Sequence, residues 1–322
     1  MTKAPRGAQD LYQPWDGDNQ AWWDWYVGLS EPSADSTRHT APPLPVAREL
    51  SDAQLRAELE APFPLTDDHR RFFRENGYIK LSEVLSAGAV LRLRRELVSA
   101  LQETFGVDVD GGVQDRFLSM EMAWLSNDTL RAFVLSPRIA GICGRLLGVD
   151  GVRLYHDNIL SKEPGCGRTP WHYDATHFPL DTDDVVTAWI PAQPIPREMG
   201  PLAFARPIDT YRLIEGHTFD TKNTSYDRLI IETLREHNIA VEDGPFALGE
   251  VSFHHNLSLH TAESNRTDRS RMVLANTFFR DDARVVERPT LISGDWKKFL
   301  PGVKPGELAA TELNPICWSE TS

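Results

Sequence analysis

The spacing of apolar and polar residues divides the chain into a helical first part and a strand-rich second part. From Ser86 to about Phe105 the apolar residues recur every three or four positions, which predicts an amphipathic helix. Another helix is expected between Thr66, a capping residue, and Gly77, a glycine stop. Residues 127–147 indicate two further helical segments, so the first part is expected to be mainly helical.

From about residue 152 the pattern changes to short apolar runs separated by glycine and proline turns. The runs are VRLYHDNIL, VVTAWI, PLAFA, EVSFHH and RMVLANTFF. Several short strands with turn signals predict an antiparallel sandwich or barrel. Tyr78–Leu81 is expected to add a strand, and residues 225–237 an inserted helix. The chain is therefore expected to be mainly β with flanking helices.

Residues 1–60 show no clear periodicity and are expected to be an irregular, aromatic-rich arm. The aromatic side chains cluster early in the arm, at Trp15, Trp22, Trp23, Trp25 and Tyr26. Aromatic rings provide a large apolar contact area, so the arm is expected to pack on the core. An alternative is a flap that contributes to a substrate pocket. Residues 61–322 are expected to form a single domain.

Composition restricts the possible partners and location. The 322-residue chain has a formal net charge of −13, which disfavours nucleic acid because binding a polyanion requires a basic surface. No apolar run is long enough to cross a membrane, and the N-terminus lacks the apolar segment of a secretory signal. Cys143, Cys166 and Cys317 are far apart, which argues against a disulfide framework. A reduced, cytoplasmic enzyme with no membrane partner is expected.

The candidate chemistry begins with His172 and Asp174. On a strand, residues i and i+2 point to the same face, so both could bind one metal ion. His-x-Asp alone is common and more often structural. His260 follows 86 residues after Asp174, and Arg271 follows eleven residues later. Two histidines and one carboxylate leave coordination positions open, as in non-haem Fe(II) oxygenases, whereas zinc prefers a closed tetrahedral set.

At this point the sequence resembles the phytanoyl-CoA dioxygenase family of Fe(II)/2-oxoglutarate oxygenases, in its bacterial branch. The resemblance covers roughly residues 70–318. The motifs that carry it, in order, are Glu75-Asn76-Gly77-Tyr78, Lys162-Glu163-Pro164-Gly165, Thr169 to Asp174, Ala188-Trp189, Gly200-Pro201-Leu202, Gly249-Glu250, His260, Asn265, Arg271, Phe299 to Gly302 and Asn314-Pro315.

The resemblance implies a double-stranded β-helix, or jelly-roll, core. It implies Fe(II) bound by His172, Asp174 and His260, with 2-oxoglutarate and O2 as cosubstrates. It assigns the C5 carboxylate of 2-oxoglutarate to Arg271, whose planar guanidinium suits a carboxylate better than Lys would. Other cosubstrate contacts are implied for Trp189 and, with less support, for Asn158, Lys162 and Thr169.

The sequence departs from the family pattern at several positions. Many members have Gln between the two ligands where this chain has Tyr173, a side chain expected to point away from the metal. The segment after Gly200 also differs, and it often borders the substrate. Related halogenases lack the carboxylate, so Asp174 favours oxidation over halogenation. Low-grade candidates for substrate contact are His177, Phe178, Arg206 and Tyr211; His254 and His255 are expected to support the ligands or the packing.

The expected function is hydroxylation of a small organic molecule, with succinate and CO2 as co-products. A specialised metabolite is preferred, because no strong basic patch is present for the phosphates of an acyl-CoA. Desaturation, cyclisation or epimerisation at the same iron is an alternative that the motifs do not separate. A non-catalytic jelly-roll module that binds metal is a further alternative. The oligomeric state is left open.

Overall fold

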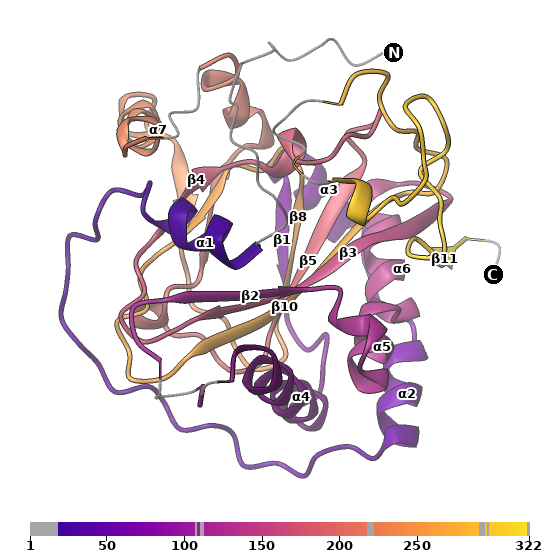
Figure 1. Cartoon of the computed structure of the whole chain (residues 1–322), viewed down its shortest axis with the longest axis horizontal. Helices are drawn as coiled ribbons and strands as arrows, with labels where there is room; N and C mark the ends of the chain where they lie inside the picture. The colour runs from indigo at the N-terminus through magenta and orange to yellow at the C-terminus, as the bar shows by residue number, and fades with distance from the viewer. Residues whose placement is uncertain are drawn as a thin grey trace.

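Two antiparallel sheets face each other and enclose the interior of the molecule (Figure 1). The computed structural model describes residues 19–106, 108–109, 113–217, 222–289, 294 and 296–320. Trp15, one of the expected arm aromatics, lies outside the described residues. The facing sheets form a jelly-roll core, as the sequence predicted.

The larger sheet contains most of the strands that the sequence predicted. Its order is β1 (Tyr78–Leu81), β8 (Val251–His255), β5 (Val185–Pro191), β10 (Arg271–Arg280), β3 (Gly151–Lys162) and β11 (Ile316–Ser319). The strand β2 (Phe117–Glu121) also pairs with β3. The strands β2 and β11 were not predicted from the apolar pattern of the sequence. The smaller sheet has the order β4 (Thr169–His172), β9 (His260–Ala262), β6 (Leu202–Arg206) and β7 (Ala240–Glu242).

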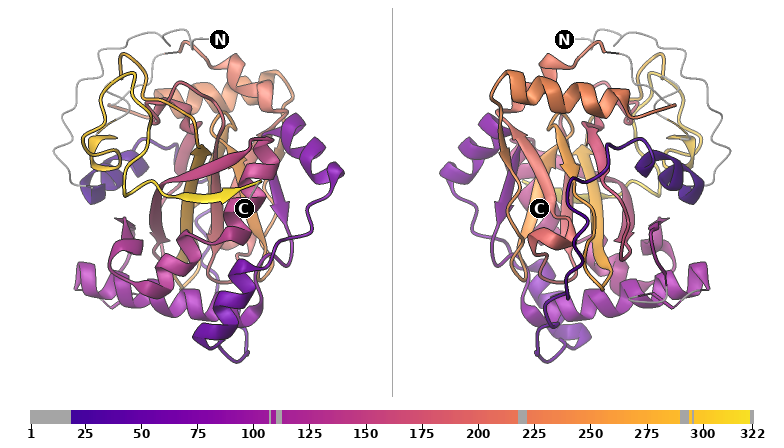
Figure 2. Two further views of the ribbon diagram at one scale, coloured as in Figure 1. Left: turned by 90° about the vertical axis from the view of Figure 1, so that its right-hand side faces the viewer. Right: turned by 90° about the vertical axis from the view of Figure 1, so that its left-hand side faces the viewer.

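Helices cover the outer face of the larger sheet (Figure 2). They are α2 (Asp52–Glu60), α3 (Asp67–Asn76), α4 (Ala87–Phe105), α5 (Asp128–Val134) and α6 (Pro137–Leu147). Between them and the sheet lies the main apolar cluster, which includes Leu93, Leu97, Phe133, Ile159 and Phe253. The inserted helix α7 (Ser225–Glu236) lies beside the smaller sheet. Short 3-10 helices are η1 (Ala123–Leu125), η2 (Asp174–Thr176), η3 (Arg197–Met199), η4 (Ile208–Leu213) and η6 (Trp296–Lys298).

One row of paired residues crosses the larger sheet on the face toward the smaller sheet. Paired residues share a face, and this row runs through His156, Thr277, Thr187, His254 and Tyr78. The Tyr78 ring stacks on Phe204 of β6 at 4.4 Å, and the His254 ring lies 4.6 Å from His260 of β9. The row therefore lies in the interior between the sheets.

A second interior row lies nearer the end of the same sheet and is formed by Phe117, Lys162 and Arg271. Lys162 and Arg271 are direct cross-strand partners, and both are fully buried, at 0% and 1% exposure. Buried cations are rare unless they have anionic partners, so this row is a candidate binding site for an anion.

The expectation that residues 1–60 are irregular is wrong, because they contain the helices α1 (Asn19–Val27) and α2. The signal for α2 was present in the sequence: Ser51 and Gln54 form a reciprocal capping box, and Leu55 and Leu59 share one buried face. Both leucines belong to the main apolar cluster. The domain boundary at residue 60 stays a prediction.

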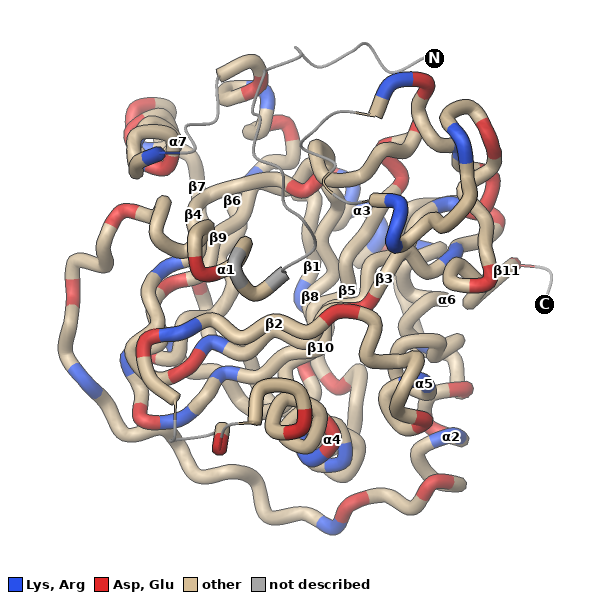
Figure 3. Tube along the Cα trace, viewed as in Figure 1, with Lys and Arg blue, Asp and Glu red and all other residues tan. Residues whose placement is uncertain are grey.

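Charged residues are distributed over the outer elements. Figure 3 shows Lys and Arg interspersed with Asp and Glu along α4 and around α2. None of the helices in the described ranges has both the length and the apolar character needed to cross a lipid bilayer.

Candidate metal and cosubstrate site

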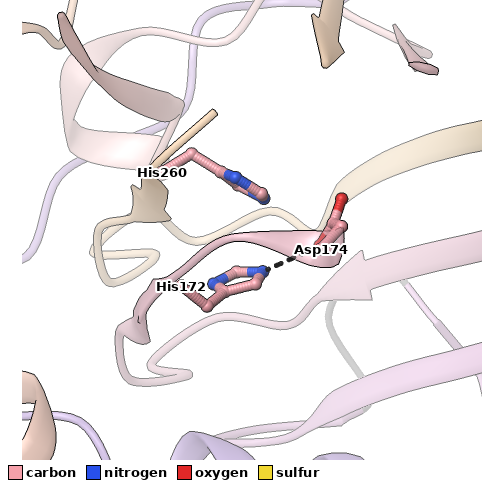
Figure 4. A group of neighbouring side chains, drawn as sticks. All are labelled: His172, Asp174 and His260. Carbon is pink, nitrogen blue, oxygen red and sulfur yellow. Dashed lines mark ion pairs between the residues drawn. The ribbon is translucent and has the colours of Figure 1, made fainter. Parts of the chain in front are cut away.

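Two strands of the smaller sheet bring together the three ligand candidates. His172 ends β4 and is paired with His260, the first residue of β9. Asp174 follows two residues after His172. One donor atom from each of the three side chains lies within 4.8 Å of the other two, and the side chains converge in Figure 4. The structure therefore places them within reach of one metal ion.

The strand expected to carry both His172 and Asp174 is shorter than predicted. It ends at His172, and Asp174 begins the 3-10 turn η2. Tyr173 between them still has an extended backbone, with φ −132° and ψ 146°. The alternation of side chains therefore continues for one more residue, and Tyr173 packs away from the site against Tyr211 at 5.8 Å.

Main-chain hydrogen bonds orient both imidazole rings. His172 Nδ1 lies 2.8 Å from the Pro170 carbonyl oxygen, and His260 Nδ1 lies 2.9 Å from the Ser258 carbonyl oxygen. A carbonyl only accepts, so Nδ1 carries the hydrogen in each ring and Nε2 keeps its lone pair for a metal. Each carbonyl belongs to the residue two positions before its histidine.

The electrostatics favour the protonation states that bind metals. Burial lowers the pKa of His260 well below its ordinary value, and burial also lowers the pKa of His172. Burial alone would raise the pKa of Asp174, but His260, His254 and His172 hold it well below its usual range. Neutral imidazoles and an ionised carboxylate are the forms that coordinate a metal ion.

Arg271, which was predicted to anchor 2-oxoglutarate, begins β10 and points into the interior. One of its terminal nitrogens donates to the Gly200 carbonyl oxygen at 2.9 Å. Its buried Nε has no hydrogen-bond partner among the described residues. The guanidinium lies 5.2 Å from the Trp189 ring and 5.9 Å from the Phe117 ring, and burial lowers its pKa to about 10. A buried donor without an acceptor fits an incoming carboxylate.

Lys162 places a second buried cation beside Arg271. Its Nζ donates to the Ala262 carbonyl oxygen at 3.2 Å and to the Glu263 carbonyl oxygen at 2.8 Å. Ala262 lies two residues after His260 on β9, so this contact joins the cation pair to the strand that carries a ligand candidate. Burial, with the neighbouring Arg271 charge, lowers the pKa of Lys162 to about 7. Two such cations form a site suited to a carboxylate-bearing molecule.

This geometry agrees with the comparison of the chain with known families. A family model described as phytanoyl-CoA dioxygenase matches residues 73–273, more than half of the chain. The chain belongs to the phytanoyl-CoA dioxygenase family. It is 22% identical over 233 residues to a probable alpha-ketoglutarate-dependent hypophosphite dioxygenase of Stutzerimonas stutzeri, covering 67% of this chain and 79% of that protein.

Solved structures of related enzymes have the same fold. The carbocyclase SnoK from nogalamycin biosynthesis is 29% identical, with a TM-score of 0.64, and the match covers 80% of this chain and 99% of that chain. The epimerase SnoN from nogalamycin biosynthesis is 23% identical, with a TM-score of 0.60, covering 77% and 96%. Both are described as non-heme and alpha-ketoglutarate-dependent. The present family member is a 2-oxoglutarate-dependent non-haem iron dioxygenase that uses iron, 2-oxoglutarate and O2.

The other cosubstrate candidates, Trp189, Asn158 and Thr169, lie on β5, β3 and β4. Trp189 is 2% exposed, and its ring lies 4.9 Å from the Phe246 ring. The Arg271 guanidinium also lies over the Trp189 ring. Asn158 is buried, and its side-chain oxygen accepts from the Ser119 hydroxyl at 2.8 Å. Thr169 begins β4, pairs with Ala262, and its carbonyl accepts from the Thr261 hydroxyl. Their contacts with 2-oxoglutarate stay predictions.

The four substrate candidates of this dioxygenase lie in different surroundings. His177 ends the η2 turn, and its backbone N–H donates to the Asp174 carbonyl oxygen at 2.8 Å. Phe178 is buried against Tyr155. Tyr211 is buried in η4 against Tyr173, and Arg206 is exposed at the end of β6. Of the four, His177 is the one with a hydrogen bond to a residue of the ligand set in the described part of the chain; all four roles stay predictions.

His254 is closer to the ligand set than its sequence position indicated. Its Nε2 lies 3.6 Å from Asp174 Oδ2, whereas His172 Nε2 lies 3.6 Å from Asp174 Oδ1. The buried His254 Nδ1 has no partner in the described chain, so a hydrogen on that atom would be unsatisfied. Nε2 is therefore the nitrogen that carries the hydrogen and faces the carboxylate. By contrast, His255 Nδ1 accepts from the Leu257 N–H in a turn.

One buried carboxylate fixes the position of β4. Asp227 of α7 accepts the Trp171 N–H at 2.8 Å, the Glu31 N–H at 2.7 Å and a guanidinium N–H of Arg168 at 3.0 Å. Trp171 immediately precedes His172, so the inserted helix and the N-terminal segment both hold the ligand-bearing strand. Sequence reasoning missed this role, because nothing in the helical pattern of residues 225–237 distinguishes Asp227 from a surface carboxylate.

Proposed function

We propose that this dioxygenase hydroxylates an unactivated C–H bond of a small organic molecule, a specialised metabolite, and releases succinate and CO2. In this proposal His172, Asp174 and His260 hold the iron, and Arg271 with Lys162 holds the distal carboxylate of 2-oxoglutarate. The observation that carries the proposal is the presence, in one interior, of a converging set of two imidazoles and a carboxylate together with two buried cations.

Iron with 2-oxoglutarate and O2 supplies an oxidant able to remove hydrogen from a C–H bond. The chain provides the geometry around that chemistry. The carbonyls of Pro170 and Ser258 orient the two imidazoles, and β10 of the larger sheet places the buried Arg271 in the same interior. The buried residues around the site limit the access of water to the reacting groups, which limits side reactions.

A second candidate is ring closure or epimerisation at the same centre. The similarity to the carbocyclase SnoK, at 29% identity over nearly all of that chain, supports it. The similarity to the epimerase SnoN adds fold-level support only. Mass spectrometry of the product separates the candidates, because hydroxylation adds one oxygen atom, ring closure removes two hydrogens and epimerisation leaves the mass unchanged.

The proposed location is the cytoplasm, supported by three cysteines that are all unpaired in the described chain. The proposed substrate is a specialised metabolite rather than an acyl-CoA, supported by the net charge of −13 and by the similarity to the carbocyclase SnoK from nogalamycin biosynthesis.

The decisive experiment is anaerobic titration of the Fe(II)-loaded protein with 2-oxoglutarate, followed by measurement of succinate after O2 is added. We expect a visible charge-transfer band as 2-oxoglutarate chelates the iron, and loss of tight 2-oxoglutarate binding in Arg271→Ala. Arg269→Ala is the matched control, because Arg269 contacts the Pro42 carbonyl outside the interior. Absence of both the band and succinate in the unmodified protein would contradict the proposal.

A further inference from the structure

The ligand set is partly accessible from outside the described chain. The side chains of His172 and Asp174 remain 17% and 18% exposed, although they lie among buried strands. His254, behind Asp174, is 3% exposed, and His260 is 4% exposed. A molecule can therefore approach the centre past His172 and Asp174, and the residues bounding that side determine what fits.

The helix α1 forms one boundary of the accessible side. It contacts both β2, an edge strand of the larger sheet, and β4, the edge strand of the smaller sheet, so it bridges the two sheets (Figure 1). The Tyr26 ring meets the His172 ring edge-on at 5.7 Å. Trp22, one turn earlier, stacks on Tyr26 at 4.5 Å and meets the His177 ring edge-on at 6.2 Å.

Specific contacts hold α1 in this position. The Gln20 side-chain amide donates to the Phe117 carbonyl oxygen at 2.5 Å and accepts from the Ser119 N–H at 3.1 Å, as a further strand would do at the edge of β2. Trp23 stacks on the Phe117 ring at 4.4 Å, and an ion pair joins Asp24 to Arg116 at 3.0 Å. The aromatic face of α1 is therefore a fixed wall of the site.

The larger sheet contributes polar groups to the same side. His156 belongs to the interior row that includes His254, and its ring stacks on Phe299 at 4.6 Å. The charge of Asp174 acts on the imidazoles of both His156 and His177. The buried Nδ1 of His156 has no hydrogen-bond partner in the described residues. The His156 side chain as a whole is half-buried, so a ligand hydroxyl or carbonyl that reaches the polar edge of the ring gains a hydrogen bond.

We propose that Trp22, Tyr26, His156 and His177 form the substrate subsite of this dioxygenase, and that it takes a planar, uncharged ring system bearing hydroxyl or carbonyl groups. The inference rests on the proposed function. Two aromatic faces provide stacking area, and two imidazoles provide hydrogen bonds. Lys298, whose charge acts on His156, is paired with Glu121 at 2.5 Å, which disfavours a phosphate-bearing substrate.

The location of α1 in the chain supports a role in specificity. Residues 19–27 lie outside residues 73–273, the segment matched by the family model. The ligand candidates and the cation pair all lie inside that segment. The subsite therefore combines the chemistry shared by the family with a wall supplied from outside the family match.

The test uses the full chain loaded with Co(II) and 2-oxoglutarate, so that binding is measured without turnover. The probe is daidzein, a planar isoflavone with two separated hydroxyl groups, and octanoyl-CoA is the charged comparison. We expect calorimetry to detect daidzein binding and little octanoyl-CoA binding. Trp22→Leu, which keeps apolar volume but removes the aromatic face, should weaken daidzein binding about threefold to tenfold.

Tyr26→Leu should have a similar effect, and His156→Phe should remove the polar part of the affinity. Val241→Ala, at an exposed position on β7 at the other edge of the smaller sheet from β4, is the control, and circular dichroism checks that each variant is folded. Equal daidzein affinity in the unmodified protein and in all three site variants would overturn the inference, as would failure of daidzein to bind or tighter binding of octanoyl-CoA. Failure of 2-oxoglutarate to bind the unmodified protein would instead overturn the proposed function, which separates the two outcomes.

Discussion

Two walls of the same interior are built by different means. One wall, called here the strand wall, is built from both sheets: His260 lies on β9 of the smaller sheet and Arg271 on β10 of the larger sheet, and main-chain hydrogen bonds between paired strands hold both in place. The opposite wall is the nine-residue helix α1, which is joined to the sheets by side-chain contacts such as Gln20 with β2. Exchanging side chains on a docked helix disturbs little else. The difference suggests a division between a rigid reaction centre and a replaceable surface for substrate choice.

The largest expected effect comes from removing a proposed iron ligand in the strand wall. His260→Ala should weaken iron binding by more than about 100-fold, because a ligand matters more than its supporting contacts. Succinate formation should fall with it. Metal content after dialysis and calorimetric iron titration measure the change, and His237→Ala, at an exposed position after α7, is the control. Full iron retention in His260→Ala would show that the centre lies elsewhere.

The next effect tests the other end of the strand wall. Arg271→Lys should weaken 2-oxoglutarate binding about 30-fold or more, because a single ammonium replaces a two-pronged donor in a buried site. Iron affinity without 2-oxoglutarate should stay the same. Arg269→Lys is the control for a charge-conserving change on the adjoining segment. If both substitutions leave the 2-oxoglutarate dissociation constant unchanged, the anchor has been assigned to the wrong residue.

A smaller effect is expected behind the ligand set. His254→Phe removes the nitrogen that faces Asp174 Oδ2 and should lower iron affinity about tenfold to 100-fold. His254→Gln, which keeps a donor, should recover much of the affinity. His255→Asn keeps the acceptor of the neighbouring turn and is the control. The electronic spectrum of the Co(II)-loaded protein should change with His254→Phe only; an unchanged spectrum would reduce His254 to a packing residue.

Lys162 predicts a dependence of 2-oxoglutarate affinity on pH. Burial and Arg271 lower its pKa to about 7 from 10.5, Arg168 adds to the decrease, and Cys166 and Glu263 oppose it. Between these values the unfolded chain binds more protons, so the stability of the protein without 2-oxoglutarate should rise with pH. A dianion favours the charged lysine, so its binding should weaken above pH 7, by at most about tenfold per pH unit.

Calorimetric titration with 2-oxoglutarate from pH 6.5 to about 8.5 measures this slope, and thermal unfolding over the same range measures the stability. Lys162→Met should flatten both profiles. A slope that persists in Lys162→Met would assign the titration to another group.

The smallest effect concerns the docking of α1. Gln20→Ala removes two hydrogen bonds to the backbone of β2 and should cost about 1–3 kcal/mol of local docking free energy. Hydrogen exchange at Ser119 should become faster while iron and 2-oxoglutarate affinities stay unchanged. A loss of iron binding in this variant would show that the docking of α1 and the metal site depend on each other, which would contradict the contrast between the two walls.

Much of the strand wall could be predicted from the sequence, because the signals for its strands are local and its motifs follow a recognisable order along the chain. The apolar periodicity predicted α4 and the principal strands. The order of motifs predicted a site at His172, Asp174 and His260, whose side chains the structure brings together, and at Arg271, which is buried. The prediction failed in residues 1–60. The Ser51–Gln54 capping box was overlooked, and α1 has neither acidic residues in its first turn nor basic residues in its last turn to mark it as a helix. The helix is held by contacts with Phe117 and His172, residues about 90 to 150 positions away.

The positions of His254 and His156 in the interior also could not be predicted from the sequence. Both occupy the same cross-strand row, but their relation depends on the pairing of four strands, which apolar spacing does not encode. The cation pair is a similar case. Lys162 and Arg271 are more than 100 residues apart in sequence, and only the register of β3 with β10 makes them neighbours.

The carbonyls that orient His172 and His260 have a consequence for how this chain tolerates mutation. Every amino acid supplies a main-chain carbonyl, so no exchange at position 170 or 258 can delete the acceptor itself. These positions are then free to drift as long as the backbone path is kept, whereas insertion or deletion of one residue in either segment would displace the acceptor. Over evolutionary time the centre should therefore be insensitive to substitution beside its ligands and intolerant of length changes there.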